Sequence, residues 1–155
     1  MRKLLVTLLS IGSFAFAQNA PKRKPDLARG EEIANEKCDT CHTLRDSKGD
    51  PVIGRFAGGK ILGKNTTLNI TSDPSGISYF DEEMLLKTLR SGKVGARKLD
   101  PEMQPPNFEE YTDDDIRDVY AYLRTVPPVK HRVDNTEPPT YCKVCRQKHG
   151  GGDTN

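Results

Sequence analysis

The sequence predicts an all-α domain, and three capped helical stretches and one glycine carry that prediction. Each stretch follows a residue whose side chain can accept the free N–H groups of a first helical turn: Asp26, Asp81 and Thr112. Gly30 lies inside the first stretch, where glycine costs about 1 kcal/mol relative to alanine. A close approach of another helix explains such a glycine, so we expect the first and last helices to cross.

A short motif at the end of the first helix predicts what the helices surround. Residues 38–42 read Cys-Asp-Thr-Cys-His, which is C-x-x-C-H, the attachment signature of a c-type haem. Cys38 and Cys41 can each form a thioether to the porphyrin, and His42 can bind the iron as the proximal ligand. The alternatives are a disulfide or half of a zinc site, and zinc would need two more ligands at matching spacing. We therefore expect crossed terminal helices around one covalently bound haem.

The first helix begins at the Asp26 cap, runs through Lys37 and delivers Cys38. Gly30, Ala34 and Cys38 are spaced by four residues, so they form one stripe of small side chains that ends at the haem. This stripe is the surface we expect to meet the last helix.

Residues 43–64 contain several glycines and the pair Asp50-Pro51, which interrupt any helix or strand pattern. A loop of this length in a small domain usually has a function, and covering one face of a cofactor is such a function. We expect a backbone carbonyl near Pro51 to accept a hydrogen bond from the second ring nitrogen of His42.

The second helix should begin after Asp81 and stop at Gly92, with an apolar face made by Leu85, Leu86 and Leu89. Beyond it, Met103 lies between prolines in a stiff, non-helical segment. A thioether held on such a segment can reach a buried iron, so Met103 is the candidate sixth ligand. The other interpretation is an ordinary core methionine.

The last helix should begin at Thr112, with Asp115 near the capping-box position, and end at Pro127-Pro128. Its apolar positions recur at helical spacing and should pack inward, with Tyr122 available to meet the first helix. These positions are Ile116, Val119, Tyr120, Leu123 and Val126.

The N-terminus has the layout of a secretory signal, with a basic start, an apolar run and a small-x-small site that predicts cleavage after Ala17. A retained anchor is the alternative, but the run is short and no second hydrophobic stretch follows, so we expect no stable membrane insertion. Residues 18–25 read as a flexible lead-in. Loss of Arg2 and Lys3 reduces the basic residues from 24 to 22, which equals the 22 acidic residues, and this balance excludes nucleic acid as a partner.

Residues 129–155 form a C-terminal tail with a second C-x-x-C motif. In an exported chain, Cys142 and Cys145 predict a disulfide; the alternative is a metal site that also uses His149. No histidine follows Cys145, which argues against a second haem. His131 remains open as a competitor of Met103 for the iron.

Residues 26–128 resemble class I cytochromes c. The resemblance rests on Gly30, the C-x-x-C-H motif, the Met103 segment and the closing residues 119–124. Residues 56–59, 69–77 and 89–92 further resemble the monohaem c-type domains of bacterial periplasmic dehydrogenase cytochrome subunits. The resemblance implies an all-α fold, one covalent haem c, His42 and Met103 as axial ligands, and one-electron transfer. Ala34 departs from it, because the family often has an aromatic there, so the crossing should depend on Tyr122.

These observations predict a periplasmic electron carrier that exchanges electrons with redox proteins such as a dehydrogenase, an oxidase or another cytochrome. Two rival functions remain: a haem enzyme or sensor with an open sixth position, and a thiol-redox or metal-binding protein that uses the tail. Ligation by Met103 would exclude the first rival, because it leaves no open site for chemistry.

Overall fold

The computed structural model describes residues 23–62, 65–95, 97–103, 107–133, 140–141 and 148–149. The predicted signal at 1–17 and the cysteines Cys142 and Cys145 lie outside the described residues. Of the predicted lead-in, 23–25 are described. Arg23 donates to the buried carboxylate of Asp118 at 2.6 Å, so the chain contacts the domain before the first helix begins.

The first helical segment is continuous from residue 27 to residue 42 but changes its winding on the way. It consists of α1 (Leu27–Ile33), a π-helical stretch η1 (Ala34–Asp39) and α2 (Thr40–His42). The Asp26 carboxylate accepts from the Arg29 amide at 3.0 Å, which confirms the predicted cap. The π-helical stretch, which the sequence did not predict, contains Cys38.

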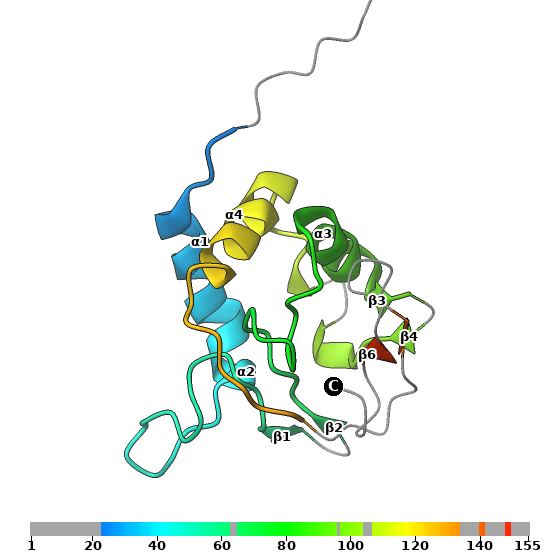
Figure 1. Cartoon of the computed structure of the whole chain (residues 1–155). Coiled ribbons are helices and arrows are strands. Elements are labelled where there is room, and N and C mark those ends of the chain that lie inside the picture. The colour runs from blue at the N-terminus through cyan, green and yellow to red at the C-terminus, as the bar shows by residue number, and fades with distance from the viewer. Residues whose placement is uncertain are drawn as a thin grey trace, which may run out of the picture.

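α1 crosses α4 (Asp113–Leu123), and Figure 1 shows the two helices side by side. A Cβ added at Gly30 would lie 2.1 Å from the Asp118 carbonyl oxygen, which confirms that the glycine allows a close approach. Ala34 is fully buried, and the Tyr122 hydroxyl reaches Glu31 at 3.3 Å. The crossing therefore uses Tyr122, as predicted.

α4 begins as predicted but ends early. Thr112 and Asp115 form a complete capping box. The helix stops at Leu123 rather than at Pro127, because the amide and hydroxyl of Thr125 both bind the Tyr122 carbonyl, at 2.8 and 2.7 Å. The predicted helix end was wrong.

The third helix, α3 (Glu82–Ser91), packs against α4 and completes the helical frame. The Asp81 carboxylate accepts from the Met84 amide at 2.7 Å, and Gly92 takes the left-handed conformation at φ 62°, so both predicted ends are confirmed. A short 3₁₀ turn, η2 (Pro101–Met103), follows, so the prediction of a non-helical segment at Met103 was wrong.

The strands are two-residue antiparallel pairs that add no layer to the fold. They are β1 (Ile61–Leu62) with β2 (Asn65–Thr66), β3 (Lys93–Val94) with β4 (Arg97–Lys98), and β5 (Thr140–Tyr141) with β6 (Lys148–His149). The predicted all-α class is confirmed. In the described part of the chain, no helix has the length and apolar character needed to cross a bilayer.

The apolar core fills the space between the three helices and the long loop after His42. It includes Ile33 from α1, Phe56 from the loop, Leu86 from α3, and Ile116 and Leu123 from α4. This core leaves one side of the α1–α2 segment facing a cavity.

Candidate functional site

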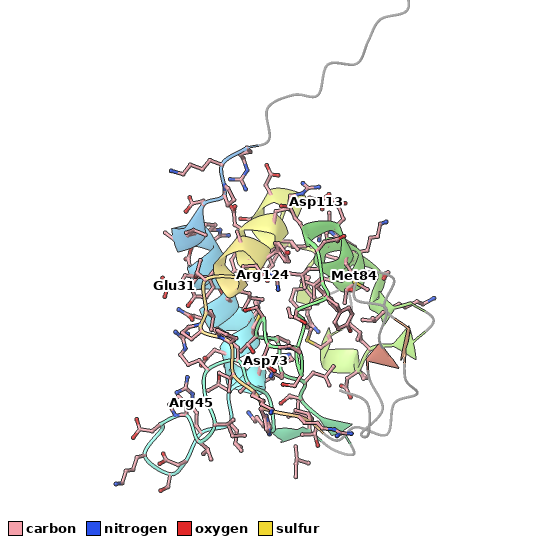
Figure 2. The ribbon with its side chains drawn as sticks, in the orientation of Figure 1. Glu31, Arg45, Asp73, Met84, Asp113 and Arg124 are labelled. Carbon is pink, nitrogen blue, oxygen red and sulfur yellow. The ribbon has the colours of Figure 1, made fainter. Side chains whose placement is uncertain are left out.

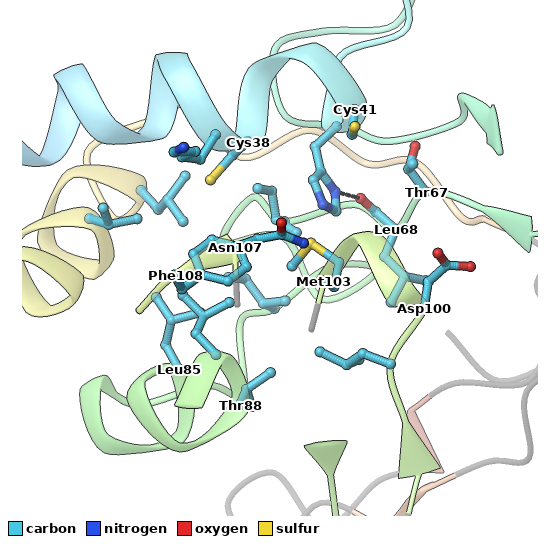
Figure 3. Close-up of a pocket in the computed structure, with 18 of the residues that line it drawn as sticks. Cys38, Cys41, Thr67, Leu68, Leu85, Thr88, Asp100, Met103, Asn107 and Phe108 are labelled. Atoms are coloured by element: carbon cyan, nitrogen blue, oxygen red, sulfur yellow. Dashed lines mark hydrogen bonds between the residues drawn. The ribbon is translucent and has the colours of Figure 1, made fainter. Parts of the chain in front are cut away.

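One cavity of about 400 Å³ brings together the candidate residues from two parts of the sequence. Cys38, Cys41 and His42 line it from the first helical segment, and Met103 lines it from η2. Figure 3 shows the two cysteines on the helix along one side and Met103 on a segment across the space. Most of the remaining wall is apolar, with Leu85, Leu89, Phe108, Val119 and Leu123 among its side chains.

Both cysteines are free thiols. Cys38 packs against the core but opens onto the cavity. The surrounding protein raises the pKa of the Cys38 thiol to about 12, because burial disfavours the thiolate and the neighbouring Cys41 and Asp39 add negative charge. Before any attachment, Cys38 is therefore a neutral thiol that faces an apolar space.

His42 is buried, and its ring is oriented by one backbone hydrogen bond. Its Nδ1 donates to the Leu68 carbonyl at 2.7 Å, drawn as the dashed line in Figure 3. Burial lowers the pKa of His42, while the Leu68 carbonyl opposes that effect. The ring is thus held neutral with its proton on Nδ1, and Nε2 keeps the lone pair that a metal requires.

The acceptor carbonyl lies 26 residues from His42 in sequence, not near Pro51 as expected, so that prediction was wrong. Pro51 instead bridges to Arg45 within the loop. Every residue has a carbonyl, so no sequence signal could single out Leu68.

Backbone pairing between two segments fixes the Leu68 carbonyl in place. Residues 56–59 run beside residues 67–70: Ile70 N donates to Phe56 O and Gly59 N donates to Thr67 O, each at 2.9 Å. Gly58 N also donates to the His42 carbonyl at 2.7 Å. A Cβ at Gly58 would lie within 2.6 Å of the Leu68 carbonyl group, so only glycine fits this packing.

Asp39, inside the C-x-x-C-H motif, anchors the end of the helix to the loop. Its carboxylate pairs with Arg45, on the projecting loop of Figure 2, and accepts from Thr43 at 2.9 Å and Arg55 at 3.4 Å. Burial tends to raise the pKa of Asp39, but these partners outweigh it and keep the pKa below its usual value. The carboxylate stays ionised and holds the motif against residues 43–55.

The Met103 segment is fixed from within and from α3. Met103 N donates to the Asp100 carbonyl at 2.9 Å, which closes the η2 turn. Arg90 of α3 donates to the carbonyls of Phe108 at 2.8 Å and Tyr111 at 2.5 Å, and so holds the chain that returns from this turn. Met84, in contrast, lies on α3 outside the cavity lining and packs against the core.

His131 does not line the cavity. Its Nδ1 donates to the Ala57 carbonyl at 2.7 Å, which places the ring against the loop. This position speaks against its competition with Met103. Across the described ranges, no three His, Cys, Asp or Glu side chains gather as a metal site, and His149 is described only as part of β6.

The residues of the cavity fit a haem. The volume falls in the range of about 300–1,000 Å³ usual for cofactor pockets, and the wall is largely apolar. Two thiols and one neutral imidazole open onto it from a single helix end. His42 is buried, and among the described residues its ring makes a hydrogen bond through Nδ1 only. A buried polar atom usually has a partner, and iron would supply one for Nε2.

Comparison with known proteins identifies the family. The cytochrome c family model matches residues 27–127. The cytochrome c subunit of the quinone alcohol dehydrogenase of Gluconobacter oxydans is 38% identical over 120 residues, which cover 74% of this chain and 24% of that protein. The fructose dehydrogenase cytochrome subunit of Gluconobacter japonicus is 32% identical over 124 residues, 77% of this chain and 25% of that protein.

The gluconate 2-dehydrogenase cytochrome c subunit of Pantoea cypripedii is 27% identical over 143 residues, which cover 90% of this chain and 32% of that protein. The chain thus spans about a quarter to a third of the length of these relatives. Helical fold, cavity and comparisons agree that this chain belongs to the cytochrome c family, as an electron-transfer domain with a covalently bound haem c.

Proposed function

We propose that the chain is a periplasmic one-electron carrier whose haem is bound through Cys38 and Cys41 and ligated by His42 and Met103. The supporting observation is the single cavity that both thiols, the imidazole and the thioether line together. Residues 1–17 support the periplasmic location, because they have the layout of a secretory signal.

Haem c, when bound, supplies reversible one-electron chemistry, and the protein's part is to position and shield it. Cys38 and Cys41 would hold it covalently. The Leu68 carbonyl orients His42 and keeps Nε2 available on one side of the cavity. Met103 would provide a thioether from η2, and the side chains of Leu85, Phe108 and Leu123 would exclude water. His/Met ligation raises the reduction potential relative to two histidines and leaves no open coordination position.

The partners we propose are redox proteins, foremost a dehydrogenase. Relatives named as cytochrome subunits of fructose, alcohol and gluconate dehydrogenases support this assignment. Docking between electron carriers usually involves small interfaces, so binding should be weak and transient.

Absorption spectroscopy of the oxidised protein tests the ligation. The wild type should show the weak red charge-transfer band of a thioether bound to ferric iron. Met103→Leu should abolish this band and allow carbon monoxide to bind the reduced protein. Met84→Leu makes the same change outside the cavity and should preserve the band. A wild type without the band that binds carbon monoxide readily would refute the carrier and favour a haem enzyme or sensor.

Mass spectrometry of the periplasmic fraction tests the location and the attachment. The mature chain should begin at Gln18 and carry one haem, and Cys38→Ala with Cys41→Ala should carry none. A chain that retains residues 1–17 in the membrane fraction would contradict the periplasmic proposal.

A further inference from the structure

The chain continues past the family match, which ends at residue 127, and packs against Asn69 and Ala57, on the two segments beside the Leu68 carbonyl. The first three residues after the prolines, 129–131, form what we call the C-terminal strap, part of the orange segment after α4 in Figure 1. Val129 N donates to Thr71 Oγ1 at 3.2 Å and His131 N donates to Ser75 Oγ at 3.0 Å. The strap is thus attached through its backbone to residues 71–75.

Asn69 is the centre of this attachment and is itself buried, with 2% of its surface exposed. Its Nδ2 donates to the strap carbonyls of Val129 at 2.8 Å and His131 at 3.2 Å. Its Oδ1 accepts from the amide and hydroxyl of Thr71, at 2.9 and 2.8 Å. Both ends of the amide are satisfied, so this orientation of Asn69 is fixed. Asn69 directly follows Leu68, whose carbonyl orients His42.

The strap also binds the second segment that surrounds this carbonyl. His131 Nδ1 donates to the Ala57 carbonyl at 2.7 Å. Ala57 directly precedes Gly58, whose backbone packs on the Leu68 carbonyl group and donates to the His42 carbonyl. The strap therefore connects residues 56–59 with residues 67–70. It does so at Ala57, next to Gly58, and at Asn69, next to Leu68.

We propose that Asn69 and His131 are positioning residues, which clamp these two segments together so that the Leu68 carbonyl stays on Nδ1 of His42. The inference rests on the proposed role of His42 as the proximal ligand. Partners of this kind raise the basicity of a ligating histidine, and a more basic histidine favours oxidised iron. Loosening the clamp should weaken the hydrogen bond and raise the reduction potential.

The experiment compares three variants of the haem-loaded protein. His131→Ala removes the donor to Ala57, and His131→Asn restores a donor near the position of Nδ1. Lys130→Ala alters the neighbouring exposed residue and is the control. Hydrogen exchange of the His42 Nδ1–H, followed by NMR, and the reduction potential are measured in each.

His131→Ala should speed the exchange of this proton by about tenfold, since it weakens a contact adjacent to the Leu68 carbonyl. It should also shift the redox equilibrium about threefold toward the reduced form, which is about 28 mV at 59 mV per tenfold. His131→Asn should recover much of both changes, and Lys130→Ala should show neither. Asn69→Ala should have the larger effect of the same sign. His131 is half-buried, so its replacement should disturb folding less than replacement of the buried Asn69. The His131 variants therefore test the clamp even if Asn69→Ala fails to take up haem.

Exchange and potential unchanged in His131→Ala, with normal proximal histidine resonances in the wild type, would overturn the clamp and leave the proposed function intact. Absence of those resonances in the wild type would overturn the ligation by His42 and the clamp with it. A change equal in His131→Ala and His131→Asn would also refute the role of the Nδ1 donor.

Discussion

Replacing Gly30 with alanine should destabilise the domain through the crossing of α1 and α4. By helix propensity alone, the change would stabilise α1 by about 1 kcal/mol. The new methyl group, however, would lie 2.1 Å from the Asp118 carbonyl oxygen and 2.5 Å from its carbon, and both are backbone atoms of α4. No side-chain rotation can relieve this overlap, so the contact must lengthen by at least about 1.3 Å to reach the 3.4 Å of ordinary van der Waals contact.

The cost of such overpacking is about 1–3 kcal/mol, and separation would also disturb Tyr122, whose Cβ lies 3.0 Å from the same point. After the propensity gain of about 1 kcal/mol, we expect a net loss of up to about 2 kcal/mol in the free energy of unfolding. For a domain of this size, a loss of about 2 kcal/mol lowers the melting temperature by about 8 °C. Denaturant unfolding of the haem-loaded protein, followed by far-UV circular dichroism, measures it directly.

Ala28→Ser is the matched control, because it adds one heavy atom at an exposed position of the same helix and should change stability by less than about 0.5 kcal/mol. If Gly30→Ala were as stable as the wild type or more stable, helix propensity would outweigh the overlap with α4. That result would refute the close crossing as the reason for the glycine.

Two further predictions concern polar contacts. Hydrogen bonds from Thr112 and the ion pair with Arg29 lower the pKa of Asp115 to about 2, so its stabilising contribution is complete above about pH 4 and is lost as the pH falls toward 2. The difference in unfolding free energy between wild type and Asp115→Asn, about 1 kcal/mol after solvent screening, should vanish across that interval in acid titrations; a constant difference would contradict this. Arg90→Lys should lose the fork that binds the Phe108 and Tyr111 carbonyls, which costs about 2 kcal/mol in thermal unfolding and weakens the red thioether band. An unchanged band would show that α3 does not hold the Met103 segment.

Local chemistry explains which parts of the fold were predictable. Asp26, Asp81 and the Thr112–Asp115 pair cap helices through contacts within three residues, so the sequence pattern contains the whole interaction. Gly30 is also informative, because an unfavourable residue inside a helix needs a compensating contact.

The parts of the candidate site that lie within a few residues of one another could be predicted from the sequence. The parts that depend on contacts between distant segments could not. The C-x-x-C-H spacing identifies its own chemistry, and the prolines around Met103 mark a stiff segment. The carbonyl of Leu68 carries no residue-specific signal, because every residue has one. Gly58 and His131 are specific residues, but their contact partners depend on long-range packing that the sequence does not reveal. The early end of α4 was missed because Val126 continues the apolar pattern after Thr125 has already ended the helix.

The C-x-x-C-H motif identifies the attachment sequence but does not determine the direction in which its thiols point. The π-helical stretch η1, which contains Cys38, contributes to that direction. The close contact of Gly30 with Asp118 fixes which face of α1 meets α4. The wider turns of Ala34–Asp39 then determine the direction around the helix axis in which Cys38 points. In an ordinary helix, each residue added or removed between Gly30 and Cys38 would turn the thiols by about 100° around the axis. A chain with an intact C-x-x-C-H and one residue fewer in that interval would still match the haem-attachment motif, yet its thiols would be turned by about 100° from their direction into the cavity. Transfer of this motif to another helix therefore has to preserve both the number of residues between Gly30 and Cys38 and the winding of the helix between them.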